Sequence, residues 1–485
     1  MSFMMSMNPS PSSPPPPLSS PSESSSTPST LPVRTIPGSY GWPLLGPISD
    51  RLDYFWFQGP DTFFRKRVEK YKSTVFRTNI PPTFPFFSVN PNIVAVLDCK
   101  SFSHLFDMEI VEKKNVLVGD FMPSVNYTGD IRVGAYLDTS EPQHAKVKNF
   151  AMDVLKQSSK IWVGELTSNL STMWDTIEKD VSEKSSSSYL APLQKFLFNF
   201  LVKCLIGADP SNSPKIAESG YIMLDRWLAF QLLPTIKIGI LQPLEELFIH
   251  SFAYPFFLVS GDYNNLSSFV EEYGKEIVAR GETEFGLSKQ EAIHNLLFIL
   301  GFNAFGGFSI FLPSLLGTVA SDTTDLQQRL VKEVRQNGGS TLTFDSIKEM
   351  PLVQSVVYET LRLNPPVPLQ FARARKDFRL SSHDAAFEVK KGELLCGFQS
   401  LVMRDPKIFS EPESFIGDRF MKDKGLLDYL YWSNGPQTGV PSVTNKQCAG
   451  KDIVTLTACL ILAYTFRRYD SISGSSSSIT ALKKA

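Results

Sequence analysis

One cysteine, Cys448, lies in the stretch NKQCAGKD at residues 445–452, directly before an apolar run that is typical of a helix. The amide N–H groups and the positive end of the helix dipole at such a position both stabilise a thiolate. The thiolate is the form in which cysteine binds a metal. A buried free cysteine that packs as a small hydrophobic side chain is the alternative interpretation. The local sequence therefore makes Cys448 a candidate sulfur ligand.

Two opposite charges, Glu359 and Arg362, stand three residues apart in the apolar stretch VVYETLRLNPPVP, so a helix would place them on one face. On a surface such a pair contributes well under ~1 kcal/mol. The apolar neighbours favour a buried pair instead, and a buried pair needs a further partner. Arg419, in PESFIGDRF, is the candidate third partner.

An uncharged stretch, NLLFILGFNAFGGFSIFLPSLLGTV at residues 295–319, carries the amide of Asn303 near its centre. Its length meets the ~20 residues of a membrane-spanning helix. The central glycines, Asn303 and Pro313 favour a long helix buried through a large domain. Burying an unpaired amide costs roughly a few kcal/mol, so Asn303 is expected to have a partner. A bond to its own helix backbone or to a buried water is the alternative to a functional role.

The remaining patterns describe the scaffold that must position these residues. Residues 140–330 are mostly helical in pattern, and residues 343–363 predict one capped helix that ends before a double proline. Residues 387–398, FEVKKGELLCGF, have the composition of strands. The fold is therefore expected to be mainly α with small β-sheets.

The N-terminal segment, residues 1–33, holds twelve serines and nine prolines and cannot bury enough apolar surface to fold. Its single acidic residue and its lack of an apolar core exclude a secretory signal and favour a plastid transit peptide. An ordinary disordered tail is the alternative. No linker follows, so residues 34–485 are expected to form a single domain.

The bulk composition narrows the function. With 48 basic and 49 acidic residues, the chain has no excess charge that would favour a nucleic-acid partner. Five scattered cysteines fit neither a disulfide framework nor a zinc knuckle. The motifs of serine hydrolases, phosphate loops, zinc proteases and Rossmann domains are missing from the sequence, which disfavours those functions.

The order of the motifs resembles that of the haem-thiolate cytochromes, the cytochrome P-450 superfamily, over nearly the whole chain after residue 34. The motifs are Glu359-x-x-Arg362, FIGDRF, Trp432-x-x-Gly435 and Lys446-x-Cys448-x-Gly450. The resemblance implies a cytochrome P-450 fold, with the haem between a long distal helix and the Cys-loop helix. It also implies haem b, iron protoporphyrin IX, with Cys448 as the proximal thiolate ligand.

The same resemblance assigns further residues to the cofactor. The residues that match positions facing the haem propionates in the family are Lys446, His144, Lys148 and Arg373. Asn434, in YWSNG, is also expected among the cofactor-binding residues. A plain surface role is the alternative for each of the four cations, because such side chains are usually solvated.

Two departures from the superfamily pattern bear on the reaction. The cysteine is expected at position 439 but lies nine residues later, after an insertion within PQTGVPSVT. The long helix reads GFNAFGGFSIF where monooxygenases carry an acid-threonine pair. A distal wall that includes Phe305 offers no proton donor for dioxygen, whereas a substrate that already contains an O–O bond needs none. Asn303 is then expected to donate to the peroxide oxygen or to steady the radical that forms beside it.

Both departures resemble the plant branch that metabolises fatty-acid hydroperoxides, which contains allene oxide synthases, hydroperoxide lyases and divinyl ether synthases. The branch implies a polyunsaturated fatty-acid hydroperoxide as substrate, plastid localisation at the envelope or thylakoid, and neither dioxygen, NADPH nor a reductase. A reductase-dependent monooxygenase and a non-catalytic haem- or lipid-binding protein are the rival hypotheses.

Within this branch, Leu117 is expected to select the product. It lies in EKKNVLVGD, where allene oxide synthases tend to carry phenylalanine, whose π face stabilises a carbon radical long enough for oxidation. Leucine favours the lyase outcome: a short-lived hemiacetal that yields a six-carbon aldehyde and a twelve-carbon oxo acid from a 13-hydroperoxide. Core packing is the alternative role for Leu117, and allene oxide or divinyl ether synthesis is the alternative reaction.

An aromatic stretch, LEELFIHSFAYPFFLVSG at residues 244–261, is too short to span a bilayer. It is expected either to line the entrance for a fatty substrate or to dock on a membrane surface. Helix packing in the core is the alternative.

Overall fold

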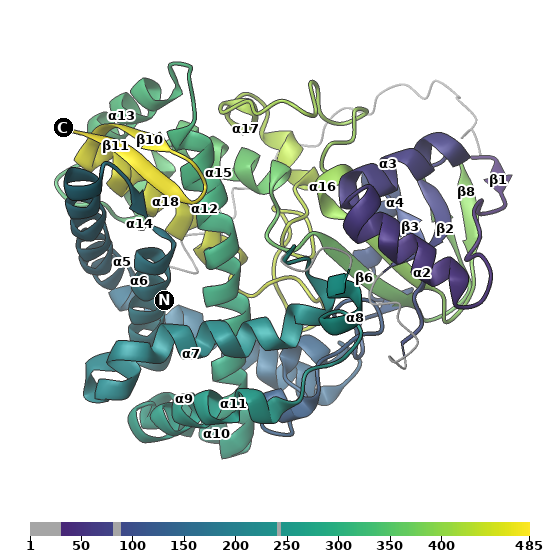
Figure 1. Cartoon of the computed structure of the whole chain (residues 1–485), viewed down its shortest axis with the longest axis horizontal. Coiled ribbons are helices and arrows are strands. Elements are labelled where there is room, and N and C mark those ends of the chain that lie inside the picture. The colour runs from purple at the N-terminus through teal and green to yellow at the C-terminus, as the bar shows by residue number, and fades with distance from the viewer. Residues whose placement is uncertain (1–30, 81–88, 240–243) are drawn as a thin grey trace, which may run out of the picture.

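Long helices occupy one part of the molecule, and a mixed sheet with short helices occupies the other (Figure 1). The computed structural model describes residues 31–80, 89–239 and 244–485. The longer helices are α3 (Pro60–Tyr71), α5 (Pro142–Lys184), α6 (Leu190–Leu201), α7 (Pro214–Leu232), α9 (Ser260–Tyr273), α10 (Lys275–Phe285), α11 (Lys289–Phe298), α12 (Gly307–Ala320), α13 (Leu326–Asn337), α15 (Pro351–Leu363) and α18 (Lys451–Arg468). The shorter helices are α2 (Leu45–Leu52), α4 (Cys99–Phe102), α8 (Glu245–Phe248), α14 (Phe344–Lys348), α16 (Gln399–Val402) and α17 (Arg419–Lys422).

The strands form three small sheets. The largest has the order β2 (Val75–Asn79), β3 (Asn92–Val96), β9 (Leu394–Phe398), β6 (Leu369–Ala374) and β4 (Val111–Glu112). The second joins β1 (Val33–Arg34), β8 (Ala386–Val389) and β7 (Phe378–Ser381), and the third joins β10 (Tyr469–Gly474), β11 (Ser478–Lys484) and β5 (Ser187–Ser188). The expectation of a mainly α fold with small sheets is confirmed.

A central helical column runs from Lys289 to Ala320 and passes through the middle of the molecule (Figure 1). By length and mean hydropathy, 1.8, it qualifies as a membrane span, but 61% of its most apolar window is buried inside the fold. The interpretation as a buried helix is therefore favoured. The sequence did not indicate that the column is interrupted by a π-helical turn, Ile299–Gly306, between α11 and α12.

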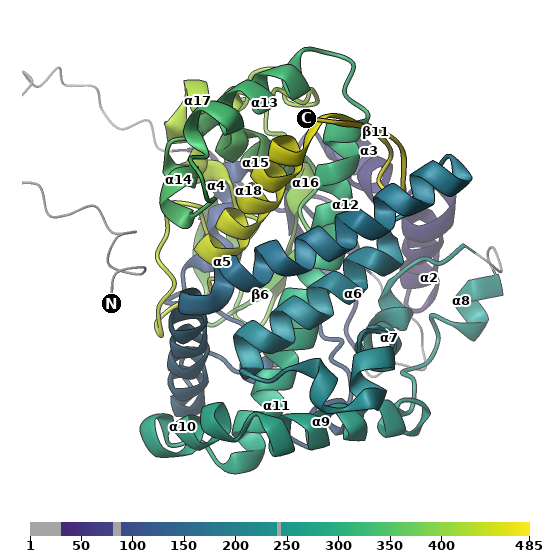
Figure 2. The same ribbon diagram turned by 90° about the vertical axis from the view of Figure 1, so that its left-hand side faces the viewer.

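Two glycines of this column permit close packing against α7. A Cβ atom at Gly301 would lie 2.7 Å from side-chain atoms of Leu224 and Trp227, and one at Gly306 would lie 2.7 Å from Leu228. On the other side, α5 and α6 lie next to each other (Figure 2), and α6 packs on the π-helical turn. Helices therefore pack against the column on more than one side.

Two boundaries differ from the sequence predictions. Residues 343–363 form two helices, α14 and α15, because Pro351 begins a new helix whose first free amides donate to Glu333. The folded chain begins slightly earlier than residue 34, since Val33 pairs with Ala386 in a parallel bridge. The rest of the predicted N-terminal tail, residues 1–30, lies outside the described residues.

Candidate functional site

Cys448 lies three residues before the first residue of α18, in a loop held by backbone hydrogen bonds. Its own N–H donates to the Ser433 carbonyl at 2.9 Å, and its carbonyl accepts from the N–H of Lys451 at 3.2 Å. Burial raises the pKa of the thiol, whereas the positive charge of Lys148 and the backbone N–H of Gly450 act to lower that pKa. The surroundings that oppose the desolvation cost are those that stabilise a thiolate ligand.

The inserted residues before Cys448 form a compact loop around one side chain, Gln447. Its amide donates to the Pro436 carbonyl at 2.6 Å and to the Ser433 hydroxyl at 3.2 Å. A Cβ atom at Gly435 or Gly439 would lie 3.0 or 2.7 Å from this side chain, so both positions need glycine for the close approach. The insertion therefore supports the cysteine loop rather than covering a separate site.

Three lysines and a histidine gather beside Cys448, although they come from distant parts of the sequence. Lys446 donates to the carbonyls of Gly134 and Leu137, at 2.8 and 2.7 Å. Lys148, from α5, donates to the Gln447 carbonyl. The other two members are His144 on α5 and Lys113.

Lys113 was missed by the sequence analysis. Its side chain is buried, and its ammonium group donates to the amide oxygen of Asn434. Asn434 has a positive φ of 61° and donates in turn to the Lys446 carbonyl at 2.9 Å. The adjacent charges in EKKN gave no sign that one lysine would turn inward, because the backbone contact that holds it is long-range: the Lys113 N–H donates to Asp138 at 2.9 Å.

The charges of this cluster favour the binding of an anion. Burial, helped by a neighbouring lysine, lowers the pKa of Lys113 and of Lys446 to about 7. Burial alone lowers the pKa of Lys148 to about 8. Burial, Lys446 and Lys148 lower the pKa of His144 to about 4, and its Nδ1 atom is buried with no hydrogen-bond partner. Within the described ranges, these three lysines form no ion pair with an acidic side chain. A dianionic group that binds beside a thiolate fits this set, and haem with its two propionates is such a group.

Arg373 has a different environment from the other predicted propionate partners. It lies on β6, is about a quarter exposed, and forms an ion pair with Asp120. It also donates to the Gly392 carbonyl at 3.1 Å. The structure therefore brings Lys446, Lys148 and His144 together and gives Arg373 its own counter-ion.

The central column presents one open stripe in an otherwise buried surface. Asn303 is exposed, a Cβ atom at Gly307 would meet nothing within 4 Å, and Ile310 is 54% exposed. These residues are spaced four and three apart, so they share one face of the helix. Within the described residues, the Asn303 amide has no hydrogen-bond partner. The expectation of a buried, paired amide is wrong, and Asn303 instead faces open space.

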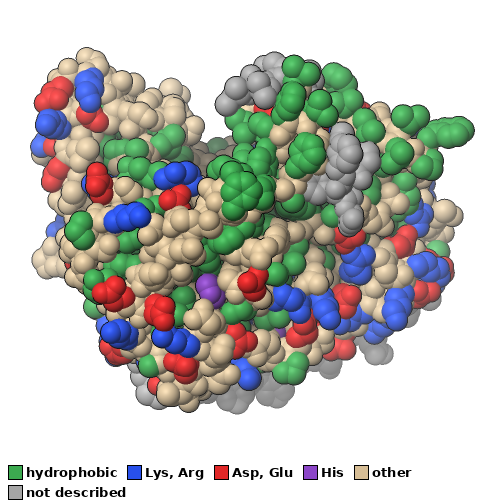
Figure 3. All heavy atoms as spheres, turned by 60° about the horizontal axis from the view of Figure 1, so that its bottom comes forward, with side chains coloured by type: hydrophobic (Ala, Val, Ile, Leu, Met, Phe, Trp, Pro, Cys, Tyr) green, Lys and Arg blue, Asp and Glu red, His purple; other side chains and the backbone are tan. Residues whose placement is uncertain are grey.

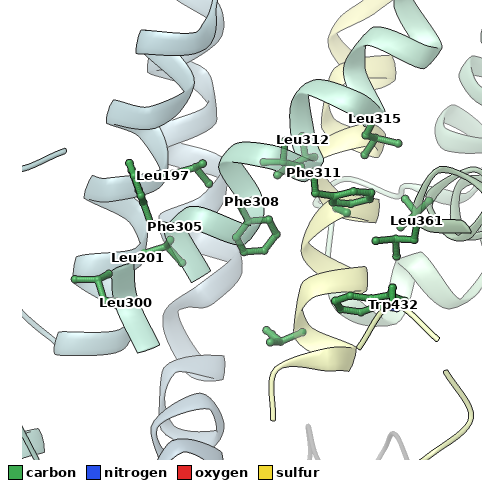
Figure 4. Close-up of a cluster of buried hydrophobic side chains, with 14 of the residues drawn as sticks. Leu197, Leu201, Leu300, Phe305, Phe308, Phe311, Leu312, Leu315, Leu361 and Trp432 are labelled. Carbon is green, nitrogen blue, oxygen red and sulfur yellow. The ribbon is translucent and has the colours of Figure 1, made fainter. Parts of the chain in front are cut away.

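Phe305 lies on the other side of the column. It is fully buried beside Leu197 and Leu201 of α6 (Figure 4). It lies two positions after Asn303, and the helical rotation turns the two side chains to opposite faces. The structure thus corrects the expectation that Phe305 lines the reaction space, and gives it a packing role.

Leu117 lies on the loop that follows Lys113. It is half-buried, packs against the main hydrophobic core, and forms an isolated bridge with Gly119. The loop is held at Asn115, whose N–H donates to the Tyr136 carbonyl at 3.0 Å. Leu117 is therefore carried by the same segment that supplies a buried cation to the cluster.

The three predicted structural charges meet in the interior. Glu359 accepts from Arg362 at 2.7 and 2.8 Å and from Arg419 at 3.0 and 3.1 Å. Arg362 also donates to the carbonyls of Met403, Pro412 and Ser414, which precede the cysteine loop. All three charged side chains are buried, so the triad fixes the chain that leads to Cys448.

Replacing Glu359 by glutamine is expected to lower the free energy of unfolding by about 3–5 kcal/mol, because two buried arginines lose the carboxylate that they share. Denaturant titration measures the change. Glu413→Gln is the matched control, since Glu413 pairs with Arg65 on the surface, and a change below about 1 kcal/mol is expected there. Equal effects of the two substitutions would contradict the role of the triad.

Sequence comparison with known proteins agrees with the fold and with the geometry of the site. The Cytochrome P450 family model matches residues 318–478. The chain is 67% identical to the fatty acid hydroperoxide lyase, chloroplastic, of Solanum lycopersicum, over 97% of this chain and 99% of that protein. It is 62% identical to the linolenate hydroperoxide lyase, chloroplastic, of Arabidopsis thaliana, over 95% of each. Identity to the allene oxide synthase, chloroplastic, of Linum usitatissimum is 42%, over 95% of this chain and 88% of that protein.

These identities extend over nearly the full length, and they fall from the lyases to the synthases. The helical column, the small sheets and the cysteine loop form the architecture that the sequence led us to expect. The chain therefore belongs to the cytochrome P450 family, in the branch of the fatty-acid hydroperoxide lyases.

Proposed function

We propose that the protein is a fatty-acid hydroperoxide lyase of the plastid, which converts a polyunsaturated fatty-acid hydroperoxide into a short-chain aldehyde and an oxo acid. The observation that carries the proposal is the contrast between 67% and 62% identity to hydroperoxide lyases and 42% identity to an allene oxide synthase. The preferred substrate is the 13-hydroperoxide. The products are then a six-carbon aldehyde and a twelve-carbon oxo acid, formed through a hemiacetal.

Haem b is the proposed cofactor, and it supplies the one-electron chemistry that breaks the O–O bond of the substrate. Cys448 provides the thiolate, and Lys113, Lys446, Lys148 and His144 hold the propionates. Asn303 orients the hydroperoxide through its unpaired amide. The open stripe beside it presents Gly307 and Ile310, neither of which carries an exchangeable side-chain proton. Proton-dependent activation of dioxygen is therefore not supported at this helix, and neither dioxygen, NADPH nor a reductase partner is required.

The test is anaerobic incubation of the purified protein with the 13-hydroperoxide of linolenic acid, without NADPH, followed by mass spectrometry. A six-carbon aldehyde and a twelve-carbon oxo acid are expected. A ketol would assign allene oxide synthesis, and a divinyl ether would assign divinyl ether synthesis. Unreacted hydroperoxide would contradict the whole proposal and return the reductase-dependent reaction to consideration.

Leu117 is proposed to set the product by withholding a π face from the radical intermediate. Leu117→Phe is expected to divert a substantial fraction of turnover from the aldehyde to allene-oxide-derived ketol, because a phenyl ring stabilises an adjacent radical. Leu117→Ile keeps the side chain aliphatic and should leave the product ratio unchanged. Quantification of aldehyde and ketol measures the effect, and an unchanged ratio for Leu117→Phe would remove Leu117 from the proposal.

Peripheral attachment to the envelope or thylakoid membrane is a further part of the proposal. Exposed apolar side chains lie near α2 and around α8, and we call them the apolar face. They are Trp42, Leu44, Leu45, Phe57, Leu244, Leu247, Phe248, Phe252, Phe257 and Leu258. In Figure 3, hydrophobic side chains gather in the upper right of the view, whereas charged side chains lie at the upper left and along the lower part. An apolar surface of this kind supports docking on a lipid surface.

Vesicle co-sedimentation tests this attachment. Replacing both Phe248 and Phe257 by glutamate is expected to lower the bound fraction several-fold, since the side chains are 59% and 73% exposed and a charge would enter the lipid. Phe256 is not a suitable site, because its ring packs edge-on against Tyr127 inside the fold. Met421→Glu, at an apolar residue on α17 that is 48% exposed, is the control. Equal binding by all three proteins would contradict the docking role.

The N-terminal segment, residues 1–33, is proposed to act as the plastid transit peptide, and residues 34–485 are proposed to act as one haem domain. The support is the composition of the segment and the word chloroplastic in the names of the relatives. N-terminal sequencing of the protein from isolated plastids would locate the cleavage site.

A further inference from the structure

One histidine and two aspartates from three separate turns of the chain meet outside the cysteine loop. They are His383 in the turn between β7 and β8, Asp98 at the N-cap of α4, and Asp405 three residues after the end of α16. The Nε2 atom of His383 lies 2.6 Å from Oδ2 of Asp405 and 4.0 Å from Oδ1 of Asp98. One ligating atom from each side chain lies within 4.8 Å of the other two, so one small ion placed between them faces all three.

Both carboxylates are buried, and the histidine is the one cationic group that pairs with them in the part of the chain that the structure describes. Asp98 is 2% exposed and Asp405 is 5% exposed. Neither forms an ion pair with a lysine or an arginine among the described residues. Lys407, two residues after Asp405, pairs with Asp384 on the surface instead. Even a protonated imidazole therefore leaves one negative charge without a partner in the interior, where an unpaired charge is costly.

Hydrogen bonds from the backbone fix the orientation of the two carboxylates. Asp98 accepts from the N–H of Ser101 at 2.8 Å and from its hydroxyl at 2.9 Å. Asp405 accepts from the N–H groups of Cys99 and Lys407, at 2.9 and 3.0 Å. An amide N–H only donates, so these contacts suit ionised carboxylates. Ligands of a metal ion are commonly held in place by outer-shell hydrogen bonds of this kind.

We propose that His383, Asp98 and Asp405 form a Zn²⁺ site that is separate from the haem iron. Imidazole nitrogen and carboxylate oxygen are both zinc ligands, and tetrahedral bonds of about 2.0–2.2 Å place the ligand atoms roughly 3.3–3.6 Å apart. The separations of 2.6 and 4.0 Å lie on either side of this range. On binding, the Nε2 proton leaves to solvent, and the charge of the ion balances that of the two carboxylates. The His383 side chain is 20% exposed, so the ion enters from that side and a water completes the four ligands.

The neighbouring thiol is not assigned as a ligand. Cys99 is buried, and its Sγ donates to the Val402 carbonyl at 3.4 Å. Burial, together with Asp405 and Asp98, raises the pKa of this thiol, so the thiolate that zinc requires is disfavoured.

The bound ion joins two sheets of the molecule. Asp98 closely follows β3, and Asp405 lies beyond α16, which follows β9; both strands belong to the five-stranded sheet. His383 connects β7 and β8 of the sheet that also contains β1. These elements lie in the part of the molecule that carries the strands (Figure 1). The role of the zinc is therefore structural, and it does not depend on the reaction at the haem.

Calorimetric titration of ZnSO₄ into the haem-loaded full chain, washed with a chelator, tests the site. Saturable binding of one zinc per chain is expected, and His383→Ala should weaken the affinity at least about 100-fold. Asp405→Asn keeps the shape of the side chain without its charge and should show a similar loss. Zinc should also raise the Tm of the wild type by a few degrees and leave that of both variants unchanged, because the site exists only in the folded chain.

Asp384→Asn is the matched control, since this carboxylate is next to His383 in the sequence but is 77% exposed and pairs with Lys407. Its zinc affinity should stay within twofold of wild type. Absence of saturable binding by the wild type, wild-type affinity in His383→Ala or Asp405→Asn, or an equal loss in Asp384→Asn would overturn the proposal. No hydroperoxide is used in these measurements, so their outcome is independent of the proposed lyase activity.

Discussion

Replacing Cys448 by alanine is expected to abolish the thiolate-type absorption spectrum and nearly all hydroperoxide turnover. Loss of an outer-shell partner at a metal site already costs roughly 10- to 100-fold, and loss of the ligand itself should exceed that. The loop around Cys448 is held by its own hydrogen bonds, from Gln447 and to the Ser433 carbonyl, so the protein should still fold. Absorption spectra of the ferric protein and of its reduced carbon monoxide complex provide the measurement.

A second cysteine supplies the matched control for this substitution. Cys459 lies within α18, away from the cysteine loop, and is 1% exposed. Cys459→Ala removes the same atoms from the interior and should leave both the spectrum and the turnover close to wild type. If Cys448→Ala kept the wild-type spectrum, the assignment of the proximal ligand would fail.

Replacing Asn303 by alanine is expected to keep the absorption spectrum and lower kcat for the hydroperoxide roughly 100- to 1000-fold, the cost of deleting one preorganised hydrogen-bond donor at a reacting oxygen. Asn303 is suited to this role because it is exposed on the open stripe and has no hydrogen-bond partner within the part of the chain that the structure describes. The amide therefore has both its donors available for substrate. Steady-state kinetics with the 13-hydroperoxide, combined with the spectrum, separate this effect from loss of haem.

Ser309 is the control on the same helix. Its hydroxyl oxygen is buried and has no hydrogen-bond partner in the described residues, so Ser309→Ala should alter kcat by no more than a few-fold. Turnover of Asn303→Ala at the wild-type level would remove the amide from the mechanism. A parallel loss in Ser309→Ala would show that the helix tolerates no change, and that the loss is one of packing.

The sequence and the structure agree where the determining interactions are local. The run before and after Cys448 predicted a cysteine at the start of a helix, and α18 begins three residues later. The i,i+3 spacing of Glu359 and Arg362 predicted a shared face, and the apolar neighbours predicted burial. Such features depend on residues within one or two turns, which periodicity reports.

Disagreements arose where one residue changes the phase of a helix or ends it. Pro351 divides a segment that reads as one helix, because the proline begins a new helix whose amides are capped by Glu333, a residue from another helix. The π-helical turn Ile299–Gly306 shifts the rotation of the central column. The hydrophobic pattern of the sequence could not show which of Asn303 and Phe305 faces the open side. The glycine, phenylalanine and alanine residues around them can occur on either face of a buried helix.

By itself, the sequence determined the family, and it predicted the cysteine ligand and a chemistry without a proton relay, because these depend on residue types and on their order along the chain. Only the tertiary structure decided which charges act together. Lys113 lies in the same cluster as Lys446 and Lys148, whereas Arg373 pairs with Asp120. The physical reason is that the charge state and the partner of a buried group are set by desolvation and by neighbours from distant segments, and no local pattern records those neighbours.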